Sequence, residues 1–285
     1  MLYNTVSYEY PYPKRIIVIG DIHGDLKRFK KILVDAKIIN DDLEWIANPP
    51  ETIVVQLGDQ VDSANRAPEI PTWEVLDDTA ILHFTNSLDN IAKAKGGRII
   101  SLIGNHELMN VIGNFSYVSE KSNVPDRNNY FKTGGILSPI LSNRPIVLKI
   151  GELFFCHAGI NKQHLMLLDS YQKDISYINH LWTQFMSTGT IDINDKELFD
   201  RLILHPDGIL WTREFNENED DGKYVMKRLG CEYIFVGHTT VEKIQIMNNR
   251  IWLIDTGISR AFGSKSYQYV DIDNFNISVK TITDI

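Results

Sequence analysis

The stretch Arg15-Ile-Ile-Val-Ile-Gly-Asp-Ile-His-Gly24 carries the clearest structural signal in the chain. It begins as a short apolar run rich in β-branched residues, which is typical of a buried strand. It ends in Gly20-Asp-Ile-His-Gly24, where polar side chains follow the strand directly. Glycine beside a polar residue lets the backbone turn sharply and come close to a ligand. The stretch therefore predicts a strand that delivers Asp21 and His23 to a binding site.

Other strand-like runs end in polar clusters of the same kind. Residues 52–57 run into Gly58-Asp-Gln-Val-Asp62, and residues 98–103 run into Gly104-Asn-His-Glu107. Residues 153–156 are followed by His157-Ala-Gly159, and residues 233–236 by Gly237-His-Thr239. In an open α/β sheet the carboxyl ends of the strands meet at one rim, where ligands are bound. The five clusters therefore predict one site rather than five.

The remaining segments complete the expected fold. Helical spacing of apolar residues predicts helices at about 25–37, with Asp25 as N-cap, and at about 73–95, 161–185, 195–204 and 222–229. Further strands are expected at 146–150, 243–247, 251–254 and 266–272, and the polar segment 115–135 is expected to be a long surface loop. Strands and helices alternate in the first half and strands crowd together at the end, which favours α/β layers with antiparallel pairs. Because no linker or repeat divides the chain, we expect one domain over residues 1–285.

The composition is that of an acidic globular protein. The 285 residues are 43% hydrophobic and 23% charged, which excludes a disordered or fibrous chain. The 29 basic and 37 acidic residues give a net charge of −8, which argues against a nucleic-acid coat or a general membrane binder. Two cysteines cannot form a disulfide framework, and neither an 18-residue apolar run nor a signal-peptide pattern occurs. We expect a cytoplasmic protein with no nucleic-acid and no membrane partner.

The polar clusters contain a set of metal-ligating side chains. The candidates are Asp21, His23, Asp59, Asn105, His157 and His238. Carboxylate and amide oxygens mixed with imidazole suit divalent Mn, Fe or Zn. Six donors are too many for one open tetrahedral site and suit two divalent ions that share a bridging carboxylate, an arrangement that typically activates a water for in-line attack on phosphorus. His106 and Asp62 remain as an acid and its orienting carboxylate for the leaving oxygen.

The ordered motifs from residue 20 to residue 239 resemble those of the calcineurin-like metallophosphoesterases, and more closely the phosphoprotein phosphatase family. The continuation Leu-Met-Asn110 after Gly-Asn-His-Glu, the His-Ala-Gly motif and Leu210-Trp-Thr-Arg213 are most similar to the bacterial-type branch called Shewanella-like phosphatases. The resemblance implies an α/β (α+β) sandwich: two mixed β-sheets flanked by helices, with a dinuclear metal site at the carboxyl ends of the strands. It also implies a hydrolase that cleaves phosphomonoesters on phosphoprotein or phosphopeptide side chains by in-line attack of a metal-bridging hydroxide.

The resemblance further implies a role for each motif residue. One metal would take Asp21, His23 and Asp59, and the other would take Asp59, Asn105, His157 and His238, so that Asp59 bridges. His106 would protonate the leaving oxygen, and Asp62 would orient its imidazole. Asn105 and an arginine would bind the phosphate oxygens.

The arginines depart from the family pattern. The family usually places Arg-Gly after the second Asp of Gly-Asp-x-x-Asp, whereas this chain continues Ser63-Ala-Asn-Arg66. Arg66 either reaches the phosphate from a displaced backbone position or is a solvated loop charge, and the sequence favours neither. Arg213 matches the family's second phosphate-binding arginine, and a planar guanidinium can bind two phosphate oxygens at once.

Several alternatives stay open at this point. Residues 161–205 have the apolar spacing of ordinary packing helices, but in this branch of the family the helices after His-Ala-Gly partly cover the active site, so a helical cap is a second interpretation. Symmetrical diadenosine tetraphosphatases share most of the motifs, although they tend to carry Asp where this chain has Glu107. A non-catalytic binding module is less favoured, because all the ligands and the His106–Asp62 pair are present. The motifs are equally compatible with phosphotyrosine and phosphoserine or phosphothreonine, and with any oligomeric state.

Overall fold

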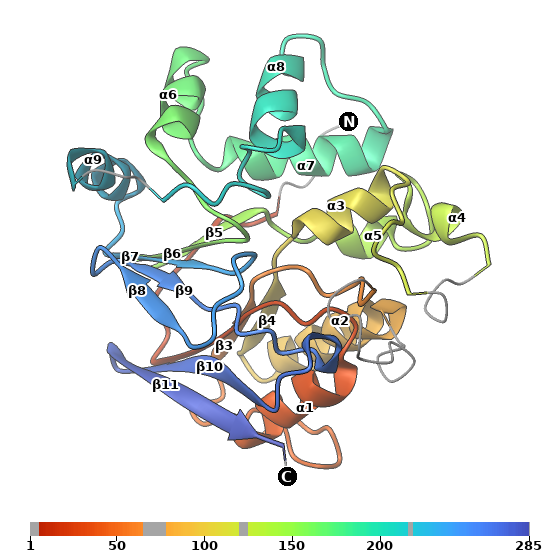
Figure 1. Cartoon of the computed structure of the whole chain (residues 1–285), viewed down its shortest axis with the longest axis vertical. Coiled ribbons are helices and arrows are strands. Elements are labelled where there is room, and N and C mark those ends of the chain that lie inside the picture. The colour runs from red at the N-terminus through yellow and green to blue at the C-terminus, as the bar shows by residue number, and fades with distance from the viewer. Residues whose placement is uncertain (1–5, 65–77, 120–124, 216–218, 285) are drawn as a thin grey trace.

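The computed structural model of the protein describes residues 6–64, 78–119, 125–215 and 219–284. Within these ranges two β-sheets lie face to face, and helices cover the outer face of each sheet (Figure 1). The expected class, two mixed sheets flanked by helices, is confirmed.

A five-stranded sheet carries the first three polar clusters. Its strands are β2 (Arg15–Ile19), β3 (Ile53–Gln56), β4 (Arg98–Ser101), β10 (Ser266–Asp273) and β11 (Asn276–Thr283). The order is β11-β10-β2-β3-β4. The centre is parallel, with Ile17 opposite Val54 and Val54 opposite Ile99, while β10 pairs antiparallel with both β2 and β11. The carboxyl ends of β2, β3 and β4 therefore lie at one rim.

A six-stranded sheet carries the other two clusters. Its strands are β1 (Glu9–Tyr10), β5 (Val147–Ile150), β6 (Leu153–Cys156), β7 (Tyr233–Val236), β8 (Gln245–Met247) and β9 (Ile251–Leu253). The order is β1-β5-β6-β7-β9-β8, with β6, β7 and β9 parallel. Each sheet thus takes strands from the opposite end of the chain: β1 joins the six-stranded sheet, and β10 and β11 join the five-stranded one.

The apolar run of β2 shows why this strand is hydrophobic at every position. Successive residues of a strand point to opposite faces. Ile16 and Val18 pack between the sheets, whereas Ile17 and Ile19 pack against the helical layer, and all four are fully buried. A strand covered on both faces reads as a continuous apolar run, and that is the pattern from which the sequence predicted it.

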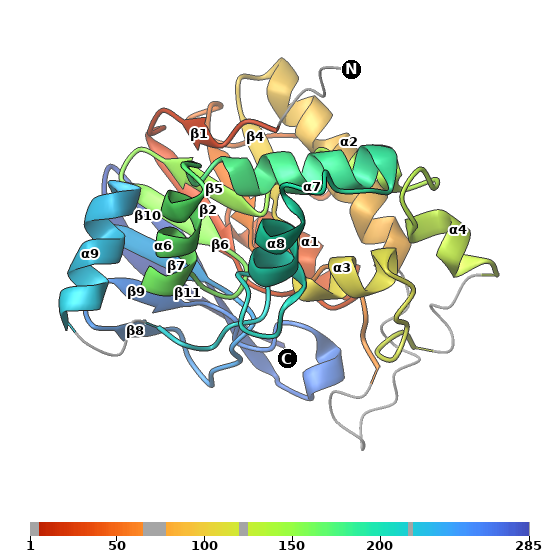
Figure 2. The same ribbon diagram turned by 90° about the horizontal axis from the view of Figure 1, so that it is seen from above.

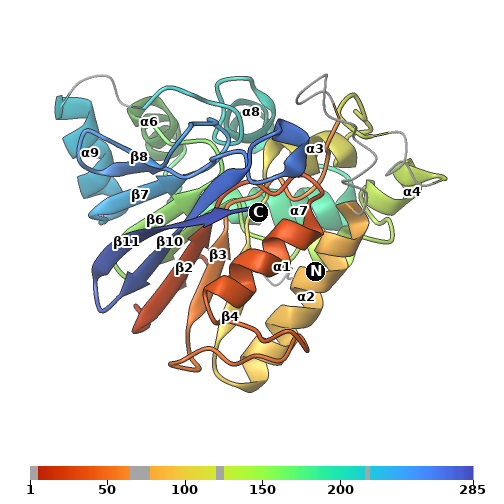
Figure 3. The ribbon, with the colours of Figure 1, turned by 60° about the horizontal axis from the view of Figure 1, so that its bottom comes forward.

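Helices form the two outer layers. They are α1 (Leu26–Asp35), α2 (Asp78–Ala94), α3 (Asn105–Val111), α4 (Arg127–Phe131), α5 (Ser138–Leu141), α6 (Lys162–Ser170), α7 (Tyr177–Thr188), α8 (Lys196–Phe199) and α9 (Glu219–Leu229). Helices α1 and α2 lie side by side against the five-stranded sheet (Figure 3). Helices α6 to α9 lie on the side of the six-stranded sheet (Figure 2). None of the helices in the described ranges is both long enough and apolar enough to span a bilayer.

The sequence predicted most elements within a few residues, and the differences have local causes. The expected helix 161–185 is divided into α6 and α7, and the expected loop 115–135 contains the short helix α4. Helix α3 was not predicted, because its polar first turn reads as part of a motif rather than as an amphipathic face. Strand β11 was missed because most of its residues are exposed, so no apolar run marks it. The N-cap assigned to Asp25 is confirmed, since its Oδ1 accepts from the backbone N–H of Arg28 at 3.1 Å.

Candidate metal centre and active site

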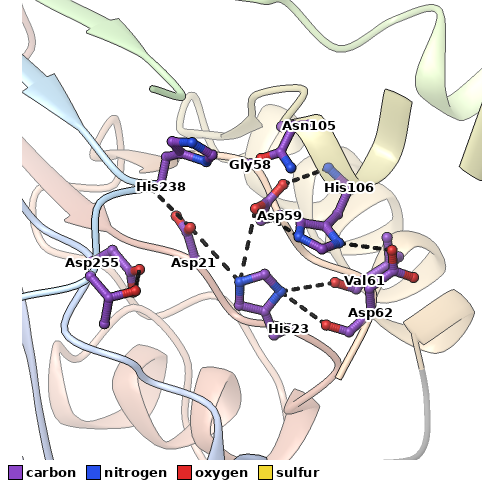
Figure 4. Close-up of polar contacts among 12 residues, drawn as sticks. Asp21, His23, Gly58, Asp59, Val61, Asp62, Asn105, His106, His238 and Asp255 are labelled. Atoms are coloured by element: carbon purple, nitrogen blue, oxygen red, sulfur yellow. Dashed lines mark hydrogen bonds and ion pairs between the residues drawn. The ribbon is translucent and has the colours of Figure 1, made fainter. Parts of the chain in front are cut away.

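The five strand ends converge on one buried cluster of polar side chains. Asp21, His23, Asp59, Asn105 and His238 point toward a common centre (Figure 4). His157, from the end of β6, joins them, because its Nε2 lies 2.9 Å from Asn105 Oδ1. All these side chains are buried except that of His238, which is half-buried. The structure therefore brings together all six side chains that the sequence marked as candidate ligands.

Asp59 lies at the middle of this cluster. Its Oδ2 atom is 3.3 Å from His157 Nε2 and 3.8 Å from His23 Nε2. Two groups of candidate donors share it: His23, Asp59 and His106 form one, and Asp59, His157 and His238 form the other, with the donor atoms of each within 4.8 Å of one another. A carboxylate shared by two donor groups is the arrangement expected of a bridging ligand.

Hydrogen bonds behind the cluster orient the imidazoles. His23 Nδ1 lies 3.1 Å from the Val61 carbonyl oxygen and 3.0 Å from that of Asp62, and His157 Nδ1 lies 2.7 Å from the Leu57 carbonyl oxygen. An Nδ1–H that donates to a carbonyl leaves the Nε2 lone pair facing the centre, which is how ligating histidines are normally held. The tautomers that fit a metal are therefore those that the surrounding backbone favours.

Two buried atoms at the centre have no hydrogen-bond partner among the described residues. They are Asp21 Oδ1 and His238 Nε2. An unsatisfied buried polar atom costs free energy, and a coordinated cation would satisfy both. The donor set and these two atoms therefore fit a metal pair bound at this position.

Carboxylates crowd the buried centre. Asp255, a residue with no role expected from the sequence, follows β9 and lies beside Asp21 (Figure 4). Burial, together with the Asp255 charge, raises the pKa of Asp21 well above its usual range. Burial also raises the pKa of Asp255, whose Oδ2 accepts from Thr240 Oγ1 at 2.7 Å. Without a cation, this group of negative charges is electrostatically costly.

The carboxylates and the imidazoles of the cluster shift one another's pKa values. Burial acts to lower the pKa of His157, but the Asp59 and Asp21 charges outweigh it and raise that pKa to about 10. Burial acts to raise the pKa of Asp59, but the surrounding imidazoles, above all His157 and His106, hold it well below its usual range. Burial and the neighbouring His157 lower the pKa of His238 to about 3. The carboxylates therefore favour positive charge on His157, and a bound divalent cation would supply positive charge to the same cluster.

His106 and Asp62 form a tight pair at the edge of the cluster. His106 Nδ1 lies 2.9 Å from Asp62 Oδ2, and His106 Nε2 lies 3.8 Å from Asp59 Oδ2. One ring nitrogen is thus held by a carboxylate while the other faces the centre. This geometry suits a proton donor whose ring orientation is fixed by its partner.

Glu107 has a role that the sequence reasoning missed. Its carboxylate accepts backbone N–H bonds from Asp59 at 2.9 Å, Gln60 at 2.7 Å and Gly104 at 2.8 Å. It therefore ties the loop after β3 to the loop after β4. The available signal was a Glu three residues after Gly104, the N-cap of α3, a position from which a carboxylate can accept free backbone N–H groups.

Two motif glycines leave room for the acidic side chains. A Cβ at Gly104 would lie 2.2 Å from Asp59 Oδ1, and one at Gly237 would lie 2.2 Å from Asp21 Oδ1. Any side chain at either position would displace a carboxylate of the cluster. These glycines therefore belong to the site although they carry no chemistry.

The two arginine assignments have different outcomes. Arg213 is exposed, and its charge helps to lower the pKa of His238, so it lies near the cluster. The neighbouring Trp211 carbonyl hydrogen-bonds the His238 ring. Arg66 lies outside the described residues.

The sequence pattern of the calcineurin-like phosphoesterase family matches residues 14–242, and the chain belongs to this family. It is therefore a hydrolase of the metallophosphoesterase class, and Shewanella-like protein phosphatases are among its homologues. One of these, Shewanella-like protein phosphatase 1 of Plasmodium berghei, is 29% identical over 287 residues, which covers 92% of this chain and 73% of the relative. An uncharacterized protein of Acanthamoeba polyphaga mimivirus, R398, is 35% identical over 248 residues, or 70% of this chain and 94% of the relative.

Solved structures support the fold. The crystal structure of the cold-active protein-tyrosine phosphatase of a psychrophilic Shewanella species has a TM-score of 0.78 at 21% identity, and the match covers 97% of this chain and 82% of that one. A protein serine/threonine phosphatase from Saccharomyces cerevisiae matches with a TM-score of 0.60 at 13% identity, over 98% of this chain and 84% of that one. The paired sheets and helical layers are thus those of metallophosphoesterases.

Proposed function

We propose that this protein is a metal-dependent phosphatase that hydrolyses phosphomonoesters on protein side chains. The observation that carries the proposal is the position of Asp59, whose Oδ2 lies 3.8 Å from His23 Nε2 and 3.3 Å from His157 Nε2, beside the His106–Asp62 pair. A shared carboxylate suits two cations, and the adjacent pair suits protonation of a leaving group.

The metal ligands of this proposal come from both sheets. Asp21, His23 and Asp59 would hold one divalent ion, and Asp59, Asn105, His157 and His238 the other, with Mn, Fe or Zn as the matching metals. When bound, such a pair supplies a water of lowered pKa and neutralises charge on the phosphate oxygens.

His106 carries the proton in the proposed reaction. The protonated imidazole would donate from Nε2 to the leaving oxygen, while Asp62 accepts from Nδ1 and stabilises the imidazolium. Asn105 and Arg213 would bind the phosphate oxygens, because an amide N–H and a guanidinium both donate to them. Arg66 is a further candidate for this role.

The protein substrate is inferred from the relatives. The homologue from Plasmodium berghei and the Shewanella and Saccharomyces structures are all named protein phosphatases, one for tyrosine and one for serine/threonine. We therefore propose a phosphorylated side chain as substrate rather than a free nucleotide.

A substrate panel tests this proposal. With Mn²⁺ present, we expect turnover of a phosphotyrosine or a phosphoserine peptide to exceed that of diadenosine tetraphosphate. His106→Asn should lower kcat by about a hundredfold or more, since general acid catalysis typically contributes at least that much. His83→Asn, at an exposed position on α2, is the matched control and should leave kcat unchanged. Dominant turnover of the dinucleotide would overturn the substrate class, and a protein that binds no metal and hydrolyses nothing would indicate a binding module.

We also propose that residues 161–205 act as a cap that limits substrate size. Leu165, Leu168 and Trp182 from these helices are fully buried, so deleting the segment would unfold the protein. Trp211 contacts the C-terminal end of the cap, because its Nε1 donates to the Ile203 carbonyl oxygen at 3.1 Å. Trp211→Ala should therefore raise the rate on a long phosphopeptide relative to p-nitrophenyl phosphate. An unchanged ratio would contradict the cap.

A further inference from the structure

A buried polar cluster lies behind the His106–Asp62 pair, and the reaction proposed above does not use it. The cluster consists of Asn110 on α3, Arg127 at the start of α4 and Asp78 at the start of α2. Their exposed fractions are 0%, 2% and 1%. Buried polar groups are normally hydrogen-bonded, so the partners of these three side chains show what the cluster holds in place.

Asn110 hydrogen-bonds the Asp62 carboxylate. Asn110 Nδ2 donates to both Asp62 oxygens at 2.9 Å and to the His106 carbonyl oxygen at 2.9 Å. One amide group therefore contacts both members of the catalytic pair. Its contacts hold the carboxylate whose Oδ2 lies 2.9 Å from His106 Nδ1.

Arg127 determines which way the Asn110 amide faces. Arg127 Nε donates to Asn110 Oδ1 at 2.7 Å, so the amide oxygen is held away from Asp62. If the amide turned over, its oxygen would face a carboxylate and its NH₂ group would face a guanidinium, and both contacts are repulsive. A second Arg127 nitrogen donates to Asp62 Oδ1 at 3.3 Å and to Asp78 Oδ2 at 2.9 Å.

Asp78 completes the arrangement by offsetting the arginine charge. A buried guanidinium beside Asp62 alone would compete with the His106 imidazolium for that carboxylate. Asp78 lies closer to the guanidinium than Asp62 does, and its Oδ2 also accepts the backbone N–H of Asp62 at 3.2 Å. The backbone of Asp62 is thus held by Asp78 and its side chain by Arg127.

We propose that Arg127 is a positioning residue for His106, acting through Asn110 and Asp62. Its guanidinium hydrogen-bonds Asn110 and Asp62, which in turn hold His106, so its contribution is to the orientation of the proton donor. The inference rests on the proposed function, because it assumes that His106 protonates a leaving oxygen.

The leaving group provides a test that separates positioning from general structural support. Nitrophenolate departs readily without a proton, whereas phenolate needs one much more. With Arg127→Met, kcat on phenyl phosphate should fall by about tenfold or more, and kcat on p-nitrophenyl phosphate by less than about threefold, with KM unchanged for both. Arg28→Met is the matched control. Arg28 is also buried, and its guanidinium hydrogen-bonds Asp284 and two backbone carbonyl oxygens that are not part of this cluster. Its loss should therefore not change the ratio of the two rates.

A second measurement does not depend on catalysis. In the zinc-loaded protein, which is diamagnetic, the His106 Nδ1 proton should give a low-field resonance that His106→Asn removes. Arg127→Met should broaden or abolish that resonance, and Arg28→Met should keep it. If the unmodified protein hydrolyses neither aryl phosphate, the proposed function fails, yet the resonance still tests the network.

Asn110→Ala keeps the test valid if Arg127→Met does not fold. This substitution removes the Asn110 hydrogen bonds to Asp62 but keeps Arg127 paired with the two buried carboxylates. It should give the same dependence of kcat on the leaving group. Equal losses on both substrates, or an unaltered His106 resonance, in the variant that folds would overturn the proposal.

Discussion

Glu107 shows how a single carboxylate can support a site through hydrogen bonds to the backbone. It accepts N–H groups from two loops that carry proposed metal ligands. Glu107→Gln replaces one acceptor oxygen with a donor and leaves buried N–H groups unpaired, so we expect a loss of about 2 kcal/mol in the free energy of unfolding and weaker Mn²⁺ binding. Urea denaturation and metal titration would measure these two effects. Exposed Glu232→Gln should change neither, and an unaltered Mn²⁺ affinity in Glu107→Gln would contradict the role.

Gly104 makes a second prediction at this scale. An alanine methyl group would lie 2.2 Å from Asp59 Oδ1, so Gly104→Ala should displace that carboxylate and lower the amount of metal bound per chain. Elemental analysis of the purified variant would show it. Gly222→Ala, in α9 with nothing within 4 Å of the added carbon, should leave metal content unchanged and stabilise the helix by about 0.5–1 kcal/mol. Full metal content in Gly104→Ala would mean that Asp59 is not a ligand.

At the residue scale, the sequence revealed those groups that carry recognisable chemistry at strand ends. It identified the six candidate ligands, and also His106 and Asp62, because each belongs to a short polar cluster that follows a strand. It could not reveal Asn110, Arg127 or Asp78, because Arg127 meets Asp62 across 65 positions and no local pattern encodes such a contact. Asp255 was missed for the same reason, since its charge acts on Asp21 only in the folded chain.

Helix α6 illustrates a prediction at the scale of an element. His164, in its first turn, is 6% exposed, accepts the Asn161 N–H at Nδ1 and contacts the Asp207 carbonyl oxygen through Nε2 at 2.7 Å. Burial lowers its pKa from 6.5 to about 4. As the pH falls from 6.5 to 4, this histidine becomes protonated in the unfolded chain but stays neutral in the folded protein. The free energy of unfolding therefore decreases across that window, by up to about 3 kcal/mol.

His164→Gln should therefore flatten the loss of stability between pH 6.5 and pH 4. Urea midpoints of both proteins across this range would measure it, with exposed His205→Gln as the control. Parallel curves for the His164 variant and the unmodified protein would show that this ring is not the titrating group.

At the element scale, strands buried on both faces were the most predictable parts of the fold. Their apolar runs leave little ambiguity, as β2 and β3 show. Elements that depend on partners were the least predictable. The two-residue strand β1 exists only because β5 lies beside it, and β11 because β10 does.

The whole molecule should respond to metal as one unit. The proposed ligands come from both sheets and surround buried carboxylates that repel one another, so a chelator should lower Tm and Mn²⁺ should raise it. Ligand linkage predicts a gain of about 2.7 kcal/mol at a free Mn²⁺ concentration one hundred times Kd. We also propose a single domain over residues 1–285, so calorimetry should show one transition that moves as a whole. Asp59→Asn should abolish the shift, and two separate transitions would contradict the single domain.

The exchange of strands between the two sheets has a consequence for how the protein is made. The ribosome delivers Asp21 and Asp59 early, but the sheet that holds them gains β10 only after residue 273 has been synthesised, and His238 also comes late. A nascent chain therefore exposes part of a metal site that cannot yet close around an ion. Metal acquisition should be a late maturation step, so the ions found in the finished enzyme would reflect the compartment in which folding ends rather than the one in which translation begins.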